Sequence, residues 1–142
     1  MKLELKHLAP YLPYRLKGIC TWEHLNKDFE VELYSASSNI LNISSPFGGN
    51  DYVEINEFKP ILRTLSDLIK EIQHNGEKFV PINTIKIFTD LNHFEYVERF
   101  IYDEETFGLL PYWVMELLLE WNFDIFGLIP HGLAVDINTL NK

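Results

Sequence analysis

The sequence predicts an α+β fold, in which a small antiparallel sheet packs against two or three helices. Apolar and charged residues alternate over residues 29–34, which indicates a half-buried strand. Two longer stretches, residues 58–74 and 110–121, place apolar residues at the spacing of an amphipathic helix. A length of 142 residues is ordinary for one domain, so we expect a single globular domain spanning residues 1–142 around one core.

The first 44 residues are predicted to form a short helix followed by a meander. Pro10 and Pro13 permit at most a short helix that ends near Leu8. The alternating strand at 29–34 has plausible antiparallel neighbours at residues 17–22 and 39–43, separated from it by turn-forming residues. Residues 44–51 read Ser-Ser-Pro-Phe-Gly-Gly-Asn-Asp, which predicts a turn, because no lysine follows at the spacing of a phosphate-binding loop.

Residues 58–74 are predicted to form the central helix of the fold. Pro60 suits the first turn of a helix, and Asn75-Gly76 offers a left-handed residue to end it. Arg63 and Asp67 lie one helical turn apart on the other face, where we expect a solvated ion pair. The predicted apolar stripe consists of Ile61, Leu62, Leu65, Leu68, Ile69 and Ile72.

The C-terminal half is predicted to contain a second helix between two strands. Residues 84–89 are strand-like, and residues 90–102 fit either an amphipathic helix or a strand. The second helix spans residues 110–121, with Pro111 in its first turn, and we expect it to pack against the first helix. A final strand is predicted over residues 133–137.

The net charge of −9 is concentrated in the C-terminal half. Residues 1–71 hold eight basic against ten acidic side chains, a net of −2, whereas residues 72–142 hold four against eleven, a net of −7. A surface of this sign repels phosphate backbones, so direct binding of nucleic acid is disfavoured.

Eight side chains of the acidic and aromatic C-terminal half form the candidate surface for a protein partner. Aromatic residues are common in protein interfaces, whereas base-stacking surfaces normally carry basic residues as well. The alternative, that the aromatic residues all belong to the core, has about equal weight. The candidate surface consists of Glu95, Glu98, Tyr102, Asp103, Glu104, Glu105, Glu116 and Glu120.

No pattern in the sequence predicts a catalytic residue, a cofactor or a metal. The five histidines are scattered without the spacing of a metal site. Cys20 is the only cysteine, so an intramolecular disulfide is excluded and a reducing compartment fits best. We expect Cys20 to be a buried, inert thiol. The N-terminus lacks a signal-peptide pattern, and the longest apolar run, residues 107–115, is too short to span a membrane. We therefore expect a cytoplasmic protein of a bacterial host with no membrane partner.

Three groups of phrases resemble a group of uncharacterised small proteins encoded by Bacteroidota and by their phages and prophages. The first is Leu-Ala-Pro-Tyr-Leu-Pro-Tyr at residues 8–14, and the second covers residues 59–68 together with Asn-Gly-Glu-Lys-Phe-Val-Pro at residues 75–81. The third covers residues 121–129 and 133–138. Thr64 and Asn122 depart from the residues of that group. The resemblance implies a phage or mobile-element context and carries no activity and no catalytic residues.

These observations leave three functional hypotheses open. The first is a non-enzymatic phage-type accessory protein that binds a protein partner through its acidic, aromatic C-terminal surface. The second is an inhibitor of host nucleic-acid-handling or defence machinery, in which spaced carboxylates imitate the phosphates of a nucleic acid. The third is a small enzyme whose site is assembled from residues dispersed along the chain.

Overall fold

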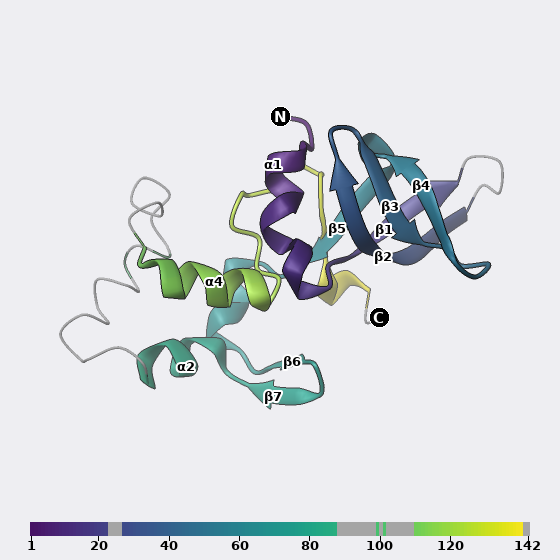
Figure 1. Ribbon diagram of the computed structural model, residues 1–142. Coiled ribbons are helices and arrows are strands. Elements are labelled where there is room, and N and C mark those ends of the chain that lie inside the picture. The colour runs from purple at the N-terminus through teal and green to yellow at the C-terminus, as the bar shows by residue number, and fades with distance from the viewer. Residues whose placement is uncertain (23–26, 88–98, 100, 102–109, 141–142) are drawn as a thin grey trace.

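The chain is built on a six-stranded sheet, accompanied by a separate two-stranded hairpin (Figure 1). The computed structural model describes residues 1–22, 27–87, 99, 101 and 110–140, the side chain of Trp22 excepted. The strands lie in the order β4-β3-β2-β1-β5-β8, and β5 and β8 are the one parallel pair in this sheet. The α+β class fits this architecture, but the predicted small antiparallel sheet is too simple, because the sheet is larger and mixed. The strands are β1 (Lys17–Trp22), β2 (Lys27–Ser37), β3 (Ile40–Ser44), β4 (Asn50–Glu54), β5 (Phe58–Leu62) and β8 (Val135–Asp136).

The predicted meander is confirmed as β1, β2 and β3, and β4 extends it by one more antiparallel strand. Val31 and Leu33 face the core, while Glu30 and Tyr34 are exposed, as the alternation in the sequence predicts. The loop predicted at residues 44–51 joins β3 to β4, and Gly48 adopts a positive φ of 102° there.

The N-terminal helix also ends where its prolines predict. Helix α1 (Leu5–Leu8) stops before Pro10, and the chain continues as a 3-10 helix, η1 (Ala9–Tyr14). Figure 1 shows this pair lying between the sheet and the helices α2 and α4. The Tyr11 side chain is fully buried, and its hydroxyl donates a hydrogen bond to the backbone oxygen of Phe123. The N-terminal segment therefore fastens the sheet to the C-terminal half.

The central helix predicted over residues 58–74 is wrong. The segment instead forms β5, a short 3-10 helix η4 (Leu65–Ile69) and strand β6 (Ile72–His74). Phe58, Ile61 and Leu62 are buried, and a strand covered on both faces gives a continuous apolar run that periodicity cannot distinguish from a helix. Ile69, counted in the apolar stripe, is 64% exposed.

Asn75-Gly76 closes a hairpin rather than ending a helix. The φ angles of Asn75 and Gly76 are 51° and 83°, the positive values that a tight two-residue turn between antiparallel strands requires. The turn joins β6 to β7 (Glu77–Phe79). The sequence therefore predicted the left-handed backbone correctly but not the element to which it belongs.

The strand predicted at residues 84–89 is also wrong over its described part. The chain forms helix α2 (Pro81–Ile87), in which Pro81 occupies the first position, where a missing N–H costs nothing. The β-branched residues of this segment favoured a strand, but Ile85 is fully buried on the inner face of the helix. Residues 88 and 89 of this predicted strand lie outside the described part of the chain, as do residues 90–98, 100 and 102 of the ambiguous stretch at 90–102.

The second predicted helix is confirmed as α4 (Tyr112–Glu120), with Pro111 as its N-cap residue. Val114 and Leu118 are fully buried on its inner face. Residues of η4, β6 and α2 share its buried cluster and η1 packs against it, in place of the long helix that was expected. The final strand is confirmed at the centre of its predicted range as β8, and a 3-10 helix, η6 (Ile137–Thr139), follows it.

The buried side chains form two clusters, where the length of the chain predicted one core. The first lies beneath the six-stranded sheet and includes Tyr11, Leu41 and Phe58. The second lies between α4, α2, η4 and β6 and is centred on Leu118. Met115 and Ile125 pack against both clusters, so the two halves of the interior meet there.

Gly18 allows the packing of the first cluster, and we predict that Gly18→Ala destabilises the protein. A Cβ atom at this position would lie 2.2 Å from two ring carbons of Phe58 on the neighbouring strand and 2.8 Å from the backbone oxygen of Lys59. Overpacking of this kind costs about 1–3 kcal/mol. Urea denaturation should show that loss, and a smaller loss when the same change is made in a Phe58→Leu background. An equal loss in both backgrounds would show that the Phe58 ring is not the obstacle.

Candidate functional site

The structure describes only two of the eight side chains predicted to form the partner surface. Glu116 and Glu120 lie on α4, where Glu116 is half-buried and Glu120 is exposed. The remaining six lie outside the described residues, so their part of the prediction stays a prediction. These six are Glu95, Glu98, Tyr102, Asp103, Glu104 and Glu105.

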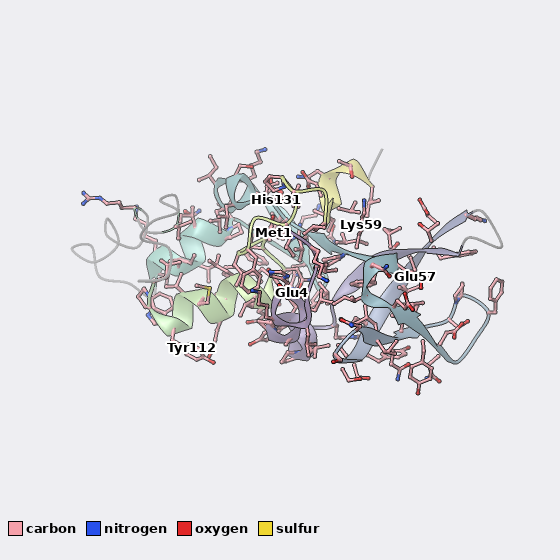
Figure 2. All side chains as sticks on the ribbon, turned by 90° about the horizontal axis from the view of Figure 1, so that it is seen from above. Met1, Glu4, Glu57, Lys59, Tyr112 and His131 are labelled. Atoms are coloured by element: carbon pink, nitrogen blue, oxygen red, sulfur yellow. The ribbon has the colours of Figure 1, made fainter. Side chains whose placement is uncertain are left out.

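The outer face of α4 carries an aromatic and acidic stripe. Tyr112, Glu116 and Glu120 are spaced by four residues, which places them on one side of the helix. Tyr112 is 76% exposed and projects from α4 at the edge of the molecule (Figure 2). We call Tyr112, Glu116 and Glu120 the α4 stripe.

Within the α4 stripe, the phenol of Tyr112 interacts with the neighbouring carboxylate of Glu116. A hydrogen bond to Glu116 raises the pKa of Tyr112, and the negative charge of Glu116 and the nearby Tyr14 raise it further. The phenol of Tyr112 and the carboxylate of Glu116 therefore lie next to each other on the outer side of α4. Exposed aromatic rings are enriched in protein-binding surfaces, and the neighbouring carboxylates give this one a negative charge.

Arg63, expected on a solvated helix face, is instead buried at the junction of the two clusters. Its side chain is only 7% exposed, and burial lowers the pKa of its guanidinium. The Nε atom donates to the backbone oxygen of Trp121 at 3.2 Å, and an Nη atom donates to that of Gln73 at 2.9 Å. Its backbone pairs with the segment after α4, through Arg63 N to Asn122 O and Asp124 N to Arg63 O, both 2.8 Å. Arg63 therefore binds four backbone groups from two other segments.

Asp67, expected to be solvated with Arg63, is also buried, at 3% exposure. One carboxylate oxygen accepts a hydrogen bond from the side-chain amide of Asn138 at 2.8 Å, and the other lies 3.6 Å from the ammonium of Lys70. The carboxylate favours the charged form of Arg63, which opposes the effect of burial on that group. Asp67 thus ties η6, near the C-terminus, to η4.

A cleft of about 420 Å³ opens beside Arg63, between β2, β6 and the end of α4. Burial and the charge of Arg63 lower the pKa of His74, which hydrogen-bonds to the backbone of Glu120. Arg15 and Glu32 form an ion pair of 3.1 Å across its rim. The Oδ1 atom of Asn122 is buried and lacks a hydrogen-bond partner among the residues that the structure describes. Arg15 and Glu32 of this cleft therefore pair with each other, and Arg63 and His74 hydrogen-bond to the backbone.

Sequence reasoning missed the roles of Arg63, Asp67 and His74. Each appeared as an ordinary polar residue on a predicted helix, and their burial arises from contacts with residues about 50 to 70 positions further along the chain. The phrase Trp121-Asn-Phe-Asp at residues 121–124 contains backbone partners of Arg63, but in the sequence it stood out only as part of the resemblance. No local pattern in the sequence links it to Arg63.

Cys20 lies in β1 and is only 1% exposed, as predicted. Burial raises the pKa of its thiol to about 12, and the charge of Glu57 adds to the effect. Among the described residues, no three histidine, cysteine or carboxylate side chains come together in a way that could hold a metal ion. In the same residues, no helix is long and apolar enough to cross a membrane.

Comparison of the chain with protein-family models, with curated proteins and with solved structures gives no match.

Cys20 is predicted to react slowly with thiol reagents in the folded protein. At pH 8 the thiol is almost entirely protonated, and the thiolate is the reactive form. Labelling with an aromatic disulfide reagent should proceed at the rate of protein unfolding and become rapid in denaturant. Rapid labelling of the native protein would contradict the burial of Cys20.

Proposed function

We propose that the chain is a non-enzymatic accessory protein that binds a basic surface of another protein through the α4 stripe. The observation that carries the proposal is the exposure of Tyr112 at 76%, in line with two carboxylates on the outer face of a helix that is buried on its inner face. Aromatic residues near the centre of an interface contribute a large share of its binding energy.

The charge of the C-terminal half favours a partner with a basic surface. Glu116 and Glu120 belong to a half with a net charge of −7, so a basic protein surface is the complementary partner. The α4 stripe is also firmly supported, because Val114 and Leu118 fix the inner face of the helix in the second cluster. A rigid helix loses little entropy when it binds, which favours a binding role for this face.

The proposal gives the buried polar groups a role in support of the helix. The side chains of Arg63 and His74 hydrogen-bond to backbone groups at the C-terminal end of α4. Hydrogen-bond donors at this end of a helix satisfy its free carbonyl groups, and the positive charge of Arg63 offsets its dipole. In this proposal the role of Arg63 and His74 is structural: they hold the C-terminal end of α4, and with it the α4 stripe, in place.

We predict that Tyr112→Ala weakens capture of the partner, whereas Tyr52→Ala does not. Both side chains are exposed tyrosines, at 76% and 66%, but Tyr52 lies on β4. The native chain and both variants would be immobilised and exposed to a Bacteroidota lysate, chosen because of the resemblance. A specific partner should be retained by the native chain and by Tyr52→Ala. Truncation of Tyr112 should weaken its affinity at least about tenfold, which corresponds to about 1.4 kcal/mol.

A double variant of the two acidic residues tests the electrostatic part of the proposal. Glu116→Gln with Glu120→Gln should slow association and reduce its dependence on salt, with little change in the dissociation rate. Loss of binding in Tyr52→Ala but not in Tyr112→Ala would contradict the proposal, as would retention of duplex DNA in place of a protein. A retained nuclease or another nucleic-acid enzyme would favour the inhibitor hypothesis for the same surface.

A further inference from the structure

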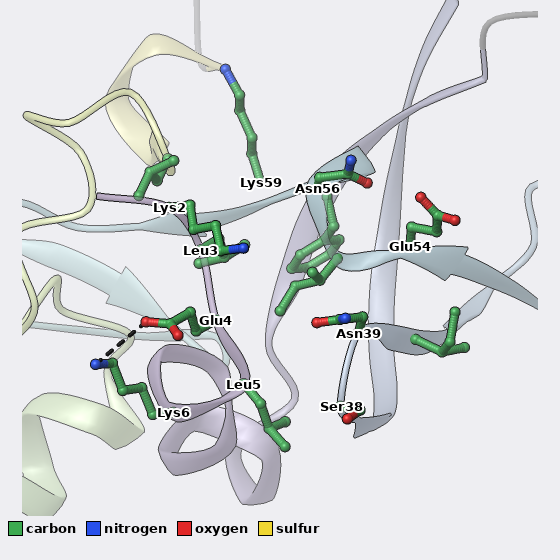
Figure 3. A pocket seen from close by; sticks show the side chains of 14 residues that line it. Lys2, Leu3, Glu4, Leu5, Lys6, Ser38, Asn39, Glu54, Asn56 and Lys59 are labelled. Carbon is green, nitrogen blue, oxygen red and sulfur yellow. Dashed lines mark ion pairs between the residues drawn. The ribbon is translucent and has the colours of Figure 1, made fainter.

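A groove of about 710 Å³ lies on a part of the molecule that the α4 stripe does not reach. One wall is the N-terminal segment, residues 2–6, and the other contains the turn between β2 and β3 and the end of β4 (Figure 3). Lys59 of β5 and Leu133 complete the lining. None of the lining residues belongs to α4.

The floor of the groove is apolar and rigid. Leu3, Ile55 and Phe58 line it, and all three are buried members of the first cluster, with exposures of 7% or less. Ile40 on the opposite wall is 44% exposed, so an apolar side chain remains open to a ligand. A volume of this size lies in the range of ligand-binding clefts, and eight of the fourteen lining residues are polar or charged, which suits a ligand with polar groups as well as apolar ones.

The rim of the groove is basic, in contrast to the rest of the protein. Lys2, Lys6 and Lys59 line it with Glu4 and Glu54, a net charge of +1 in a chain of −9. Lys6 is neutralised by Glu4, whose carboxylate lies 3.3 Å from its ammonium. Lys2 and Lys59 form no ion pair with any other residue in the described part of the chain, and both are exposed. Among the described residues, two unpaired positive charges therefore stand against one unpaired carboxylate on the rim, that of Glu54.

The polar groups of the walls suit the backbone of a peptide. Asn39 is exposed, and its side-chain amide makes no hydrogen bond to another described residue, so both its donor and its acceptor are available. Figure 3 shows Lys2 on one wall and Asn39 on the other, both turned toward the opening between them. Successive side chains of an extended peptide point in opposite directions, so one set can reach the floor while the other meets the rim.

We propose that this groove binds an extended acidic segment of a protein partner, in which acidic and apolar residues alternate. The apolar residues lie on Leu3, Ile55 and Ile40, and the carboxylates meet Lys2 and Lys59. Asn39 hydrogen-bonds to the peptide backbone. The groove and the α4 stripe then attract opposite charges, which lets one small protein contact an acidic and a basic surface at different places.

The test is a fluorescence anisotropy titration of the full chain with two labelled eight-residue probes. One probe alternates glutamate with leucine, and the other has lysine in place of each glutamate. The acidic probe should bind, and the basic probe should not. Lys2→Glu with Lys59→Glu should weaken binding of the acidic probe at least tenfold, and Ile40→Ser should weaken it without a change in melting temperature.

The matched control is Lys17→Glu with Lys78→Glu, which makes the same change in net charge at exposed sites outside the groove. This control should reduce binding of the acidic probe less than threefold, and Tyr112→Ala should leave it unchanged. Equal losses in both double variants would overturn the proposal, because they would show attraction to net charge alone. Equal binding of the two probes would also overturn it, as would binding only to vesicles of anionic lipid.

Discussion

The side chain of Arg63 is the contact on which the two halves of the structure depend. It stands at the end of β5, and its guanidinium donates to Trp121 at the end of α4 and to Gln73 in the hairpin strand β6. A buried cation costs free energy unless its hydrogen bonds are satisfied, so its position fixes the positions of these two carbonyl groups. Its backbone also pairs with the residues on either side of Phe123. The sheet, the hairpin and the end of α4 are therefore joined through hydrogen bonds of one residue.

This arrangement explains which elements could be predicted from the sequence. The meander and α4 follow from local alternation and helical spacing, and the turn at residues 75–76 follows from its Asn-Gly pair. Residues 58–74 could not be predicted in this way, because β5 is defined by pairing with β1 and β8, which are distant in the sequence. Burial on both faces of β5 removed the alternation that identifies a strand. For the same reason the burial of Arg63 and Asp67 could not be seen, since their partners are Trp121 and Asn138.

The two surfaces with a proposed role differ in how visible they were in the sequence. Glu116 and Glu120 of the α4 stripe belong to the surface predicted from the sequence, whereas Tyr112 was not included in it. The groove is assembled from the N-terminal segment, two turns and β5, and no pattern joins Lys2 to Lys59. The net charge of the chain, −9, also gives no indication that this groove has a basic rim. Charge separated between two surfaces allows each to select a different partner and to reject the other.

The central claim is that Arg63 couples the two clusters, and native-state amide hydrogen exchange measures this coupling directly. In the native chain, the slowest amides of β1 to β3 and those of α4 should exchange with the same free energy of opening. In Arg63→Leu the carbonyl groups of Trp121 and Gln73 lose their donors, at about 1–3 kcal/mol each, so the values for α4 and β6 should fall by about 2–6 kcal/mol. Those of β1 to β3 should fall less, and the exposed Arg15→Leu should change neither group by more than about 1 kcal/mol. Equal losses in the sheet and in α4 of Arg63→Leu, or no loss in either, would contradict the account.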